Sequence, residues 1–487
     1  MYQEPPSPTL FSRRCLFTAL QYLALVGIPF VFLIGILIAG QHLQAPAATG
    51  SVTAVKQIGG GASMPNLLLL LGQMVLIIAV ARCVGFLFRV IHQPQVVGEM
   101  AAGIMLGPSL FGWLAPEWFH AVFPLTSLGF LNSVSQIGLL VFMFLVGLEL
   151  DPKLLRAQGA TVLITSHMSI AVPFVLGAAL ALGLYIELSD SSVSFVGFAL
   201  FLGAAMSVTA FPVLARILAE KHLMHTRVGA AALACAAIDD VTAWIILAAV
   251  VLLVRSSMTQ GPLWLAIGGS FLFVSTMLMW VRPLLGRFRR HFCELTHDRL
   301  ALVLVFALLS ALITEWLGIH ALFGAFLAGA VLPRETDFIR ALTEKLEDVT
   351  LVFLLPLFFA FTGLRTSLEM VSGGTLWAAF GLIMAVAVFG KFGGSAIAAR
   401  MAGMSWPEAS AMGVLLNTRG LMELVILNVG LDIGVISPTL FAMMVLMALL
   451  TTFMTTPLLE WILPADVLDP EEANELGRLS GGGSPSR

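Results

Sequence analysis

The chain has 487 residues, of which 59% are hydrophobic and only 11% are charged, and its mean hydropathy is +0.98. These values lie far outside the range of soluble globular proteins and predict a polytopic membrane protein. The net charge of −3 leaves no basic block for nucleic acid, and the four cysteines follow neither zinc-site nor disulfide spacing, so these classes of protein are set aside.

The first predicted membrane span runs near residues 16–39 and is followed by a Gly-rich linker around residues 59–61. Because Arg13, Arg14 and a patch of small residues flank this span, it also resembles a cleaved secretory signal. Its apolar run is long for a signal, and we therefore favour its retention. Residues 1–63 are assigned to a cytoplasmic N-terminus, an extra N-terminal transmembrane helix and a linker.

Thirteen further apolar runs follow the linker. Runs of about 20 apolar residues cross a bilayer as helices, because lipid offers the backbone no hydrogen-bond partner. They lie near residues 65–88, 95–111, 127–149, 161–185, 194–218, 228–254, 262–282, 299–317, 320–333, 347–364, 373–399, 407–431 and 437–463. Residues 64–463 are therefore assigned to one transmembrane domain, and residues 464–487 are expected to form a short disordered cytoplasmic tail.

The distribution of basic residues supports this number of spans, since cytoplasmic loops carry an excess of Lys and Arg. If the chain starts inside, twenty basic residues fall on the inner side and only Lys56, Arg255 and Arg365 fall outside. Both termini are accordingly predicted to be cytoplasmic, in a multi-pass protein of the cell (inner) membrane.

Two adjacent aspartates, Asp239 and Asp240, lie in the middle of the apolar run 230–254. Carboxylates at membrane depth are costly and usually functional, although a structural ion pair is the alternative. Burial and mutual repulsion both disfavour two negative charges, so protons and metal cations can compete for the pair. This competition is the central requirement of an exchanger.

A lysine, Lys391, interrupts a later span and is flanked by Gly390, Gly393 and Gly394, which favour the close approach of another helix. A buried lysine keeps its charge opposite a carboxylate, so one of the two aspartates is its expected partner. The alternative is a side chain that extends to the membrane surface, which the distance from Arg400 along the chain disfavours.

Two other spans have polar, helix-breaking centres. Pro212 removes a backbone hydrogen bond from its span and frees carbonyls beside the hydroxyls of Ser207 and Thr209. Residues 417–420, Asn-Thr-Arg-Gly, interrupt a second span in the same way. Either motif alone is also compatible with a proline kink or a glycine contact. Together they are typical of the discontinuous helices with which transporters bind ions near the midplane.

The two interrupted spans are the fifth and the twelfth of the thirteen, so they cross the membrane in opposite directions, as an inverted repeat requires. The same offset relates the aspartate span to the last one. The predicted cation- and proton-binding site takes Asp239, Asp240, Ser207 and Thr209 from one repeat and Lys391, Asn417 and Thr418 from the other. Arg419 and Glu423, one helical turn apart, are predicted to form a structural ion pair that braces the broken helix.

Six segments of the chain resemble the monovalent cation:proton antiporter 2 family, with its plant cation/proton exchangers and their bacterial relatives. They are Gln93–Glu99 with Gly107 and Pro108, Phe144–Leu150, Ser207–Arg216, Ile238–Val241, Gly324–Gly329 and Asn417–Asn428. The resemblance implies an all-α membrane protein with the sodium-proton antiporter fold of two inverted repeats. The chain departs from the family in its extra first span, which is not part of the common core, so the expected architecture is 13 core helices plus one N-terminal helix. The resemblance also implies a homodimer in the bilayer, in which a six-helix core moves.

Carried onto this sequence, the resemblance makes Asp240 the cation and proton carrier and Asp239 the partner of Lys391. Na+ or K+ would bind transiently at Asp240 and Thr209. An Asp-Asp pair at this place is associated with electrogenic exchange of two protons per cation. The nucleotide-binding regulatory domain of the potassium-efflux members is expected to be absent.

The sequence therefore predicts a secondary active antiporter that exchanges Na+ or K+ for H+ by alternating access, without a cofactor. A cation efflux channel without obligatory proton coupling and a non-transporting membrane sensor are the alternatives. An intramembrane aspartyl protease is disfavoured because such enzymes need aspartates on two different helices. No enzymatic activity is therefore expected.

Overall fold

The computed structural model describes residues 27–45, 67–149, 159–191, 193–221, 223–224, 226–258, 263–287, 295–318, 320–333 and 336–462. Within these ranges all regular secondary structure is helical. Ten helical segments are long and apolar enough to cross a membrane, a bent pair forms one more span, and three shorter apolar helices accompany them. The expected all-α polytopic fold is confirmed, and each of the thirteen predicted core spans has a helical counterpart.

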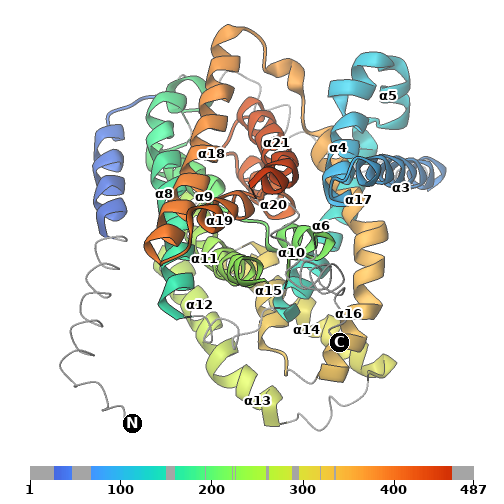
Figure 1. Ribbon diagram of the computed structural model, residues 1–487. Helices are drawn as coiled ribbons and strands as arrows, with labels where there is room; N and C mark the ends of the chain where they lie inside the picture. Colours follow the sequence, from blue (N-terminus) through green and yellow to red (C-terminus); the bar gives the residue numbers. More distant parts are fainter. Residues whose placement is uncertain are drawn as a thin grey trace, which may run out of the picture.

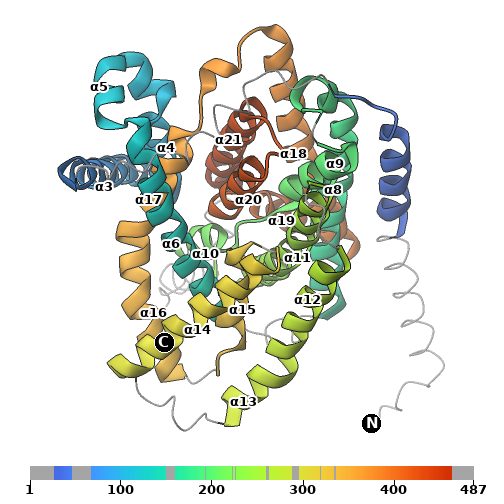
Figure 2. The same cartoon turned by 180° about the vertical axis from the view of Figure 1, so that it is seen from behind.

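A short apolar helix, Gly27–Gly40, lies at one edge of the molecule, opposite α3 (Leu67–Val90) (Figures 1 and 2). Its end packs closely on the core, because a Cβ atom at Gly40 would lie 1.9 Å from the ring of Phe195. The start of the predicted first span, residues 16–26, the linker and the tail lie outside the described residues.

One group of helices, the flanking bundle, lies toward the side of α3 (Figure 1). It consists of α3, α4 (Gln95–Leu106), α5 (Pro116–Val122), α6 (Leu125–Glu149), α14 (His297–Trp316), α15 (Ala321–Val331), α16 (Thr336–Val349) and α17 (Leu355–Leu364). Here α4 packs on α3 and α17, and α6 packs on α15 and α17. The flanking bundle therefore forms a continuous wall beside the rest of the protein.

Glycines allow this wall to pack tightly, because α4 and α17 meet at Gly103 and Gly363. A Cβ atom at Gly363 would lie 1.9 Å from the carbonyl oxygen of Gly103. We expect Gly363→Ala to destabilise the protein by about 1–3 kcal/mol, since the backbones must separate. Thermal unfolding of the detergent-purified protein measures this loss. Gly381→Ala, at a helical position with no atom within 4 Å, is the matched control, and equal midpoints for both variants would contradict the close contact.

The predicted span near residues 347–364 begins earlier in the structure than expected. Helix α16 starts at Thr336 and continues through a π-helical turn, Thr350–Leu354, into α17. Its sequence alternates charged residues such as Arg340 and Glu344 with apolar ones, so a search for apolar runs does not recognise it.

The remaining helices form the core bundle and its neighbours. The core bundle consists of α8 (Gly159–Leu188), α9 (Phe195–Ser207), α10 (Phe211–Glu220), α11 (Arg227–Met258), α18 (Gly374–Met401), α19 (Trp406–Leu416), α20 (Leu421–Asp432) and α21 (Pro438–Ile462). Next to it lie α12 (Leu263–Thr276) and α13 (Arg282–Arg287), joined by a π-helical turn, Met277–Val281. The short turns Pro108–Gly112 and Leu368–Met370 complete the described helices.

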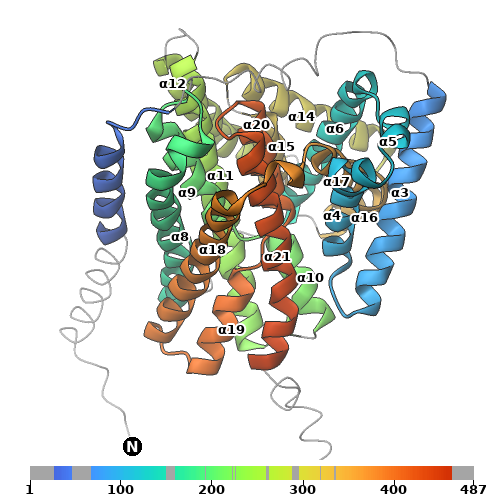
Figure 3. The same cartoon turned by 90° about the horizontal axis from the view of Figure 1, so that it is seen from above.

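The core bundle contains both predicted discontinuous helices, and both interruptions are confirmed. The first span is interrupted at residues 208–210, between α9 and α10, and the second at residues 417–420, between α19 and α20, with a bend of 41°. In Figure 3, α9 and α20 lie on one side of the crossing and α10 and α19 on the other. The two broken helices therefore run in opposite directions and meet where both are unwound.

Candidate functional site

The two unwound segments are bonded directly to each other. The backbone amide of Ala210 donates to the carbonyl of Thr418 at 3.0 Å. Pro212 lies in the first turn of α10, where its missing N–H costs nothing. Gly420, which precedes α20, has φ +153°, a conformation that favours glycine, and a Cβ there would lie 3.0 Å from the side chain of Val213. The first helix is therefore interrupted next to a proline, Pro212, and the second at a glycine with positive φ, Gly420.

The break leaves the last carbonyls of α9 without partners in their own helix, and side chains supply them. Ser207 Oγ donates to the carbonyl of Ala204 at 2.8 Å. Arg419 donates to the carbonyls of Ala205 and Met206 at 3.1 and 2.7 Å, and Lys391 Nζ donates to that of Ser207. All four carbonyls of the last turn therefore accept a hydrogen bond, three of them from the positively charged side chains of Arg419 and Lys391 in the other repeat.

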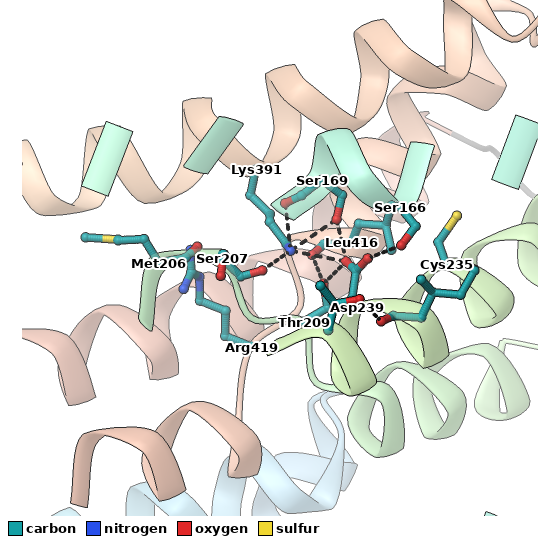
Figure 4. A network of polar contacts seen from close by, with 12 residues as sticks. Ser166, Ser169, Met206, Ser207, Thr209, Cys235, Asp239, Lys391, Leu416 and Arg419 are labelled. Carbon is teal, nitrogen blue, oxygen red and sulfur yellow. Dashed lines mark hydrogen bonds and ion pairs between the residues drawn. The ribbon is translucent and has the colours of Figure 1, made fainter. Parts of the chain in front are cut away.

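Asp239 lies at the centre of this network and is completely buried (Figure 4). Its Oδ1 accepts from Ser166 Oγ at 2.6 Å. Its Oδ2 accepts from Thr209 Oγ1 at 2.7 Å, from Ser169 Oγ, and from Lys391 Nζ at 3.3 Å. The carboxylate of Asp239 is consequently surrounded by three hydroxyl groups and one ammonium group.

Lys391 reaches this position from α18, which packs closely against α8. A Cβ at Gly394 would lie 2.9 Å from Val172 of α8, and a Cβ at Gly390 would lie 3.1 Å from Leu176 of the same helix. These two glycines allow the expected close approach. The expectation was wrong for Gly393, which has no atom within 4 Å of a Cβ, because it faces away from α8.

Asp240 has a different environment from its neighbour. Its side chain is also buried, at 3% exposure, but neither carboxylate oxygen has a hydrogen-bond partner among the described residues. The amide of Phe211, the first residue of α10, lies close to the carboxyl group without forming a hydrogen bond of regular geometry. A buried carboxylate without partners is costly, so Asp240 is chemically the least satisfied acid of the site.

The charges at the crossing do not balance. Lys391 pairs with Asp239 at 3.3 Å, and Arg419 pairs with Glu423 at 3.0 Å, with all four side chains fully buried. Asp240 is the fifth charged residue at the crossing, and it has no ion pair among the described residues. When all five groups are ionised, one negative charge is left over, which a single bound cation or proton neutralises.

The other predicted site residues lie at the crossing in three different ways. The hydroxyl of Ser207 is bonded within α9, so this residue reaches the site only through its carbonyl. The hydroxyl of Thr418 donates to that of Thr455 on α21 at 3.3 Å. Asn417 is buried, and its side-chain oxygen has no hydrogen-bond partner among the residues that the structure describes. Of these three, only Asn417 offers an unused side-chain oxygen.

Ser166 and Ser169 of α8 were not predicted, although they contact Asp239 directly. Two polar residues three positions apart lie on the same face of a helix. Such a pair in an otherwise apolar span is a signal that the sequence contains. Its meaning depends on the rotation of α8 toward α11, which the sequence pattern does not give.

The sequence and the fold of this chain are similar to those of known ion exchangers. The family model for sodium/hydrogen exchangers, transmembrane part, matches residues 75–463. The Na(+)/H(+) antiporter NhaS4 of Synechocystis sp. is 44% identical over 404 residues, which cover 82% of this chain and 98% of that protein.

Two further relatives extend this similarity. The K(+)/H(+) antiporter 1 of Saccharomyces cerevisiae is 34% identical over 447 residues, or 88% of this chain, and the match spans about half, 50%, of the yeast protein. Among solved structures, the sodium proton antiporter MjNhaP1 from Methanocaldococcus jannaschii matches with a TM-score of 0.61 over 83% of this chain and 99% of that chain. At 16% identity, this last similarity concerns the fold.

Proposed function

The chain belongs to the sodium/hydrogen exchanger family and is a cation:proton antiporter, and we propose that Asp240 is the residue at which its two substrates compete. The observation that carries this assignment is the buried carboxylate of Asp240 at the crossing of the broken helices, the one acid there that no described residue compensates. A site that is left with one negative charge needs one positive partner. Since a proton and a monovalent cation satisfy the same need, they exclude each other.

We propose that oxygen atoms of the crossing hold Na+ or K+, the two ions in the names of the relatives. The proposed transient ligands are the Asp240 carboxylate, the Thr209 hydroxyl oxygen and the unpartnered side-chain oxygen of Asn417. Thr209 donates its hydrogen to Asp239, which leaves the lone pairs of its oxygen free to accept a cation. Ser207 and Thr418 support the unwound segments instead, through their bonds to Lys391 and Thr455.

The proposed cycle is secondary active transport by alternating access. The cation binds at Asp240 from one side, the core bundle moves relative to the flanking bundle, and a proton displaces the cation on the other side. The bonds from the Lys391 and Arg419 side chains to the end of α9 hold the two unwound segments together during this movement. We further propose a homodimer in the cell (inner) membrane, with both termini cytoplasmic and the transported ions as its only required small molecules.

Purified protein in liposomes is expected to acidify or alkalinise the lumen when a Na+ or K+ gradient is imposed, with the direction set by that gradient. A pH-sensitive dye trapped inside measures this exchange. Cation flux that ignores an imposed pH gradient would point to a channel instead. The absence of cation flux in correctly folded protein would point to a sensor. Repeating the assay with Na+ and K+ separately identifies the transported ion.

A further inference from the structure

Two serines of α8, Ser166 and Ser169, direct their hydroxyls at a residue of another helix. Serine and threonine in a helix commonly bond to a carbonyl one turn earlier in the same helix, as Thr451 and Thr452 of α21 do here. Ser166 and Ser169 are fully buried and donate instead to the two carboxylate oxygens of Asp239 on α11. Their orientation is therefore directed to this carboxylate.

With these two serines, Asp239 has a full set of donors. Thr209 and Lys391 supply the other two, and an ionised carboxylate offers about four lone-pair sites. A proton on Asp239 would have to displace or reverse one of these bonds, and the Lys391 ammonium group has no lone pair with which to accept it. Asp239 consequently has no vacant position for a cation or a proton.

We propose that Ser166 and Ser169 are positioning residues of the exchange reaction, which hold Asp239 as a fixed negative charge beside Lys391. Only Asp240 then exchanges its partner during the cycle. Ser169 acts on both members of the pair, because its hydroxyl lies 3.1 Å from Lys391 Nζ and its carbonyl lies 3.0 Å from the same nitrogen. This inference rests on the proposed role of Asp240 as the carrier.

The other charged and titratable groups near Asp239 do not replace the hydroxyls. Those groups are Lys391 from α18, Arg419 and Glu423 from the second broken helix, and Cys235 and Asp240 from α11 itself. Among the described residues, only Lys391 from this set bonds to the Asp239 carboxylate. Without the two serines, the carboxylate therefore keeps one hydroxyl and the ammonium group.

The test compares the parent protein with the double variant Ser166→Ala/Ser169→Ala in liposomes. Exchange rates are measured over a pH series, together with the membrane potential that the exchange itself generates under fixed ion gradients. Because only Asp240 changes its partner in the parent, one proton replaces one cation and no potential is expected at any pH, in contrast to the two protons per cation that the resemblance implies. In the variant, Asp239 becomes a second proton acceptor, so two protons replace one cation and a potential develops over the pH range in which Asp239 titrates. The acid limb of the rate profile moves by about one pH unit or more to higher pH.

Two further variants separate positioning from general packing. Ser395→Ala removes a buried serine hydroxyl of α18 that bonds to none of the described residues, and it is expected to behave as the parent. Ser169→Thr keeps the hydroxyl and is expected to retain the parental pH profile, whereas Ser169→Ala shifts it. If the double variant matches Ser395→Ala in both readouts, or if Ser169→Thr behaves as Ser169→Ala, the proposal is overturned. If the parent protein itself exchanges no cation for protons, the proposed function is wrong, and the role of the two serines in it falls with it.

Discussion

Asp240→Asn is expected to abolish cation:proton exchange. The substitution keeps the size of the side chain but removes the negative charge at the crossing of the broken helices for which the described part of the chain supplies no partner. The bound cation and the Asp240 carboxylate form a buried charge pair, and removing one member of such a pair costs about 3–5 kcal/mol, so cation binding should weaken by about 100-fold to 1,000-fold or more. Because the asparagine side chain also takes up no proton at neutral pH, neither substrate is carried.

Asp239→Asn is the informative comparison for this prediction. It removes a carboxylate of the same helix that is already paired with Lys391 and three hydroxyls. We expect it to alter the charge moved per turnover or the coupling more than the apparent cation affinity. Exchange in liposomes measures both variants. Parental exchange by Asp240→Asn, with folded protein verified by size-exclusion chromatography, would refute the role of Asp240 as the carrier.

Arg419→Met is expected to cause the largest loss of stability among single substitutions at the crossing. Arg419 is a completely buried side chain that pairs with Glu423 and donates to the end of α9. Its removal leaves the Glu423 charge and two carbonyls without partners, at a cost of about 3–5 kcal/mol. The thermal unfolding midpoint of the detergent-purified protein should therefore fall clearly below that of the parent.

A second substitution tests the origin of this loss. Arg419→Met/Glu423→Leu also removes the stranded charge, so it should recover part of the midpoint, but not the part that depends on the carbonyls of α9. Arg227→Met is the control, because Arg227 is an exposed residue whose ion pair with Glu408, at 3.8 Å, is worth at most about 1 kcal/mol. If Arg419→Met unfolds at the same temperature as Arg227→Met, the bracing role is wrong.

The membrane spans and the two helix interruptions could be predicted from the sequence, because each of them depends on a short segment of the chain. Apolar length gives the thirteen core spans, and Pro212 and Gly420 mark the two interruptions that the structure contains. The position of Lys391 within an apolar span required a carboxylate partner. Such signals reside in single residues or short segments, so they survive without knowledge of the packing.

The side-chain directions at the site were less predictable, because they depend on how each helix is rotated and where it unwinds. Ser207 turns its hydroxyl into α9, and Thr418 turns its hydroxyl to α21, although both lie at the predicted break. Ser166 and Ser169 contribute from a helix in which no residue had been assigned to the site. The distribution of hydrogen bonds among neighbouring polar residues is settled only when the two repeats are packed together.

The bonds that cap α9 also bear on the order in which the protein folds during synthesis. Asp239 precedes Lys391 by 152 residues, and Ala205 precedes Arg419 by 214, so the ribosome completes the first half of the site long before its counter-charges exist. Until then, the first half offers Asp239 and the end of α9 only its own hydroxyl groups, those of Ser166, Ser169, Thr209 and Ser207. The site of the first repeat is therefore complete only after α18 and the second broken helix have packed against it, so the two repeats are expected to reach their final structure together.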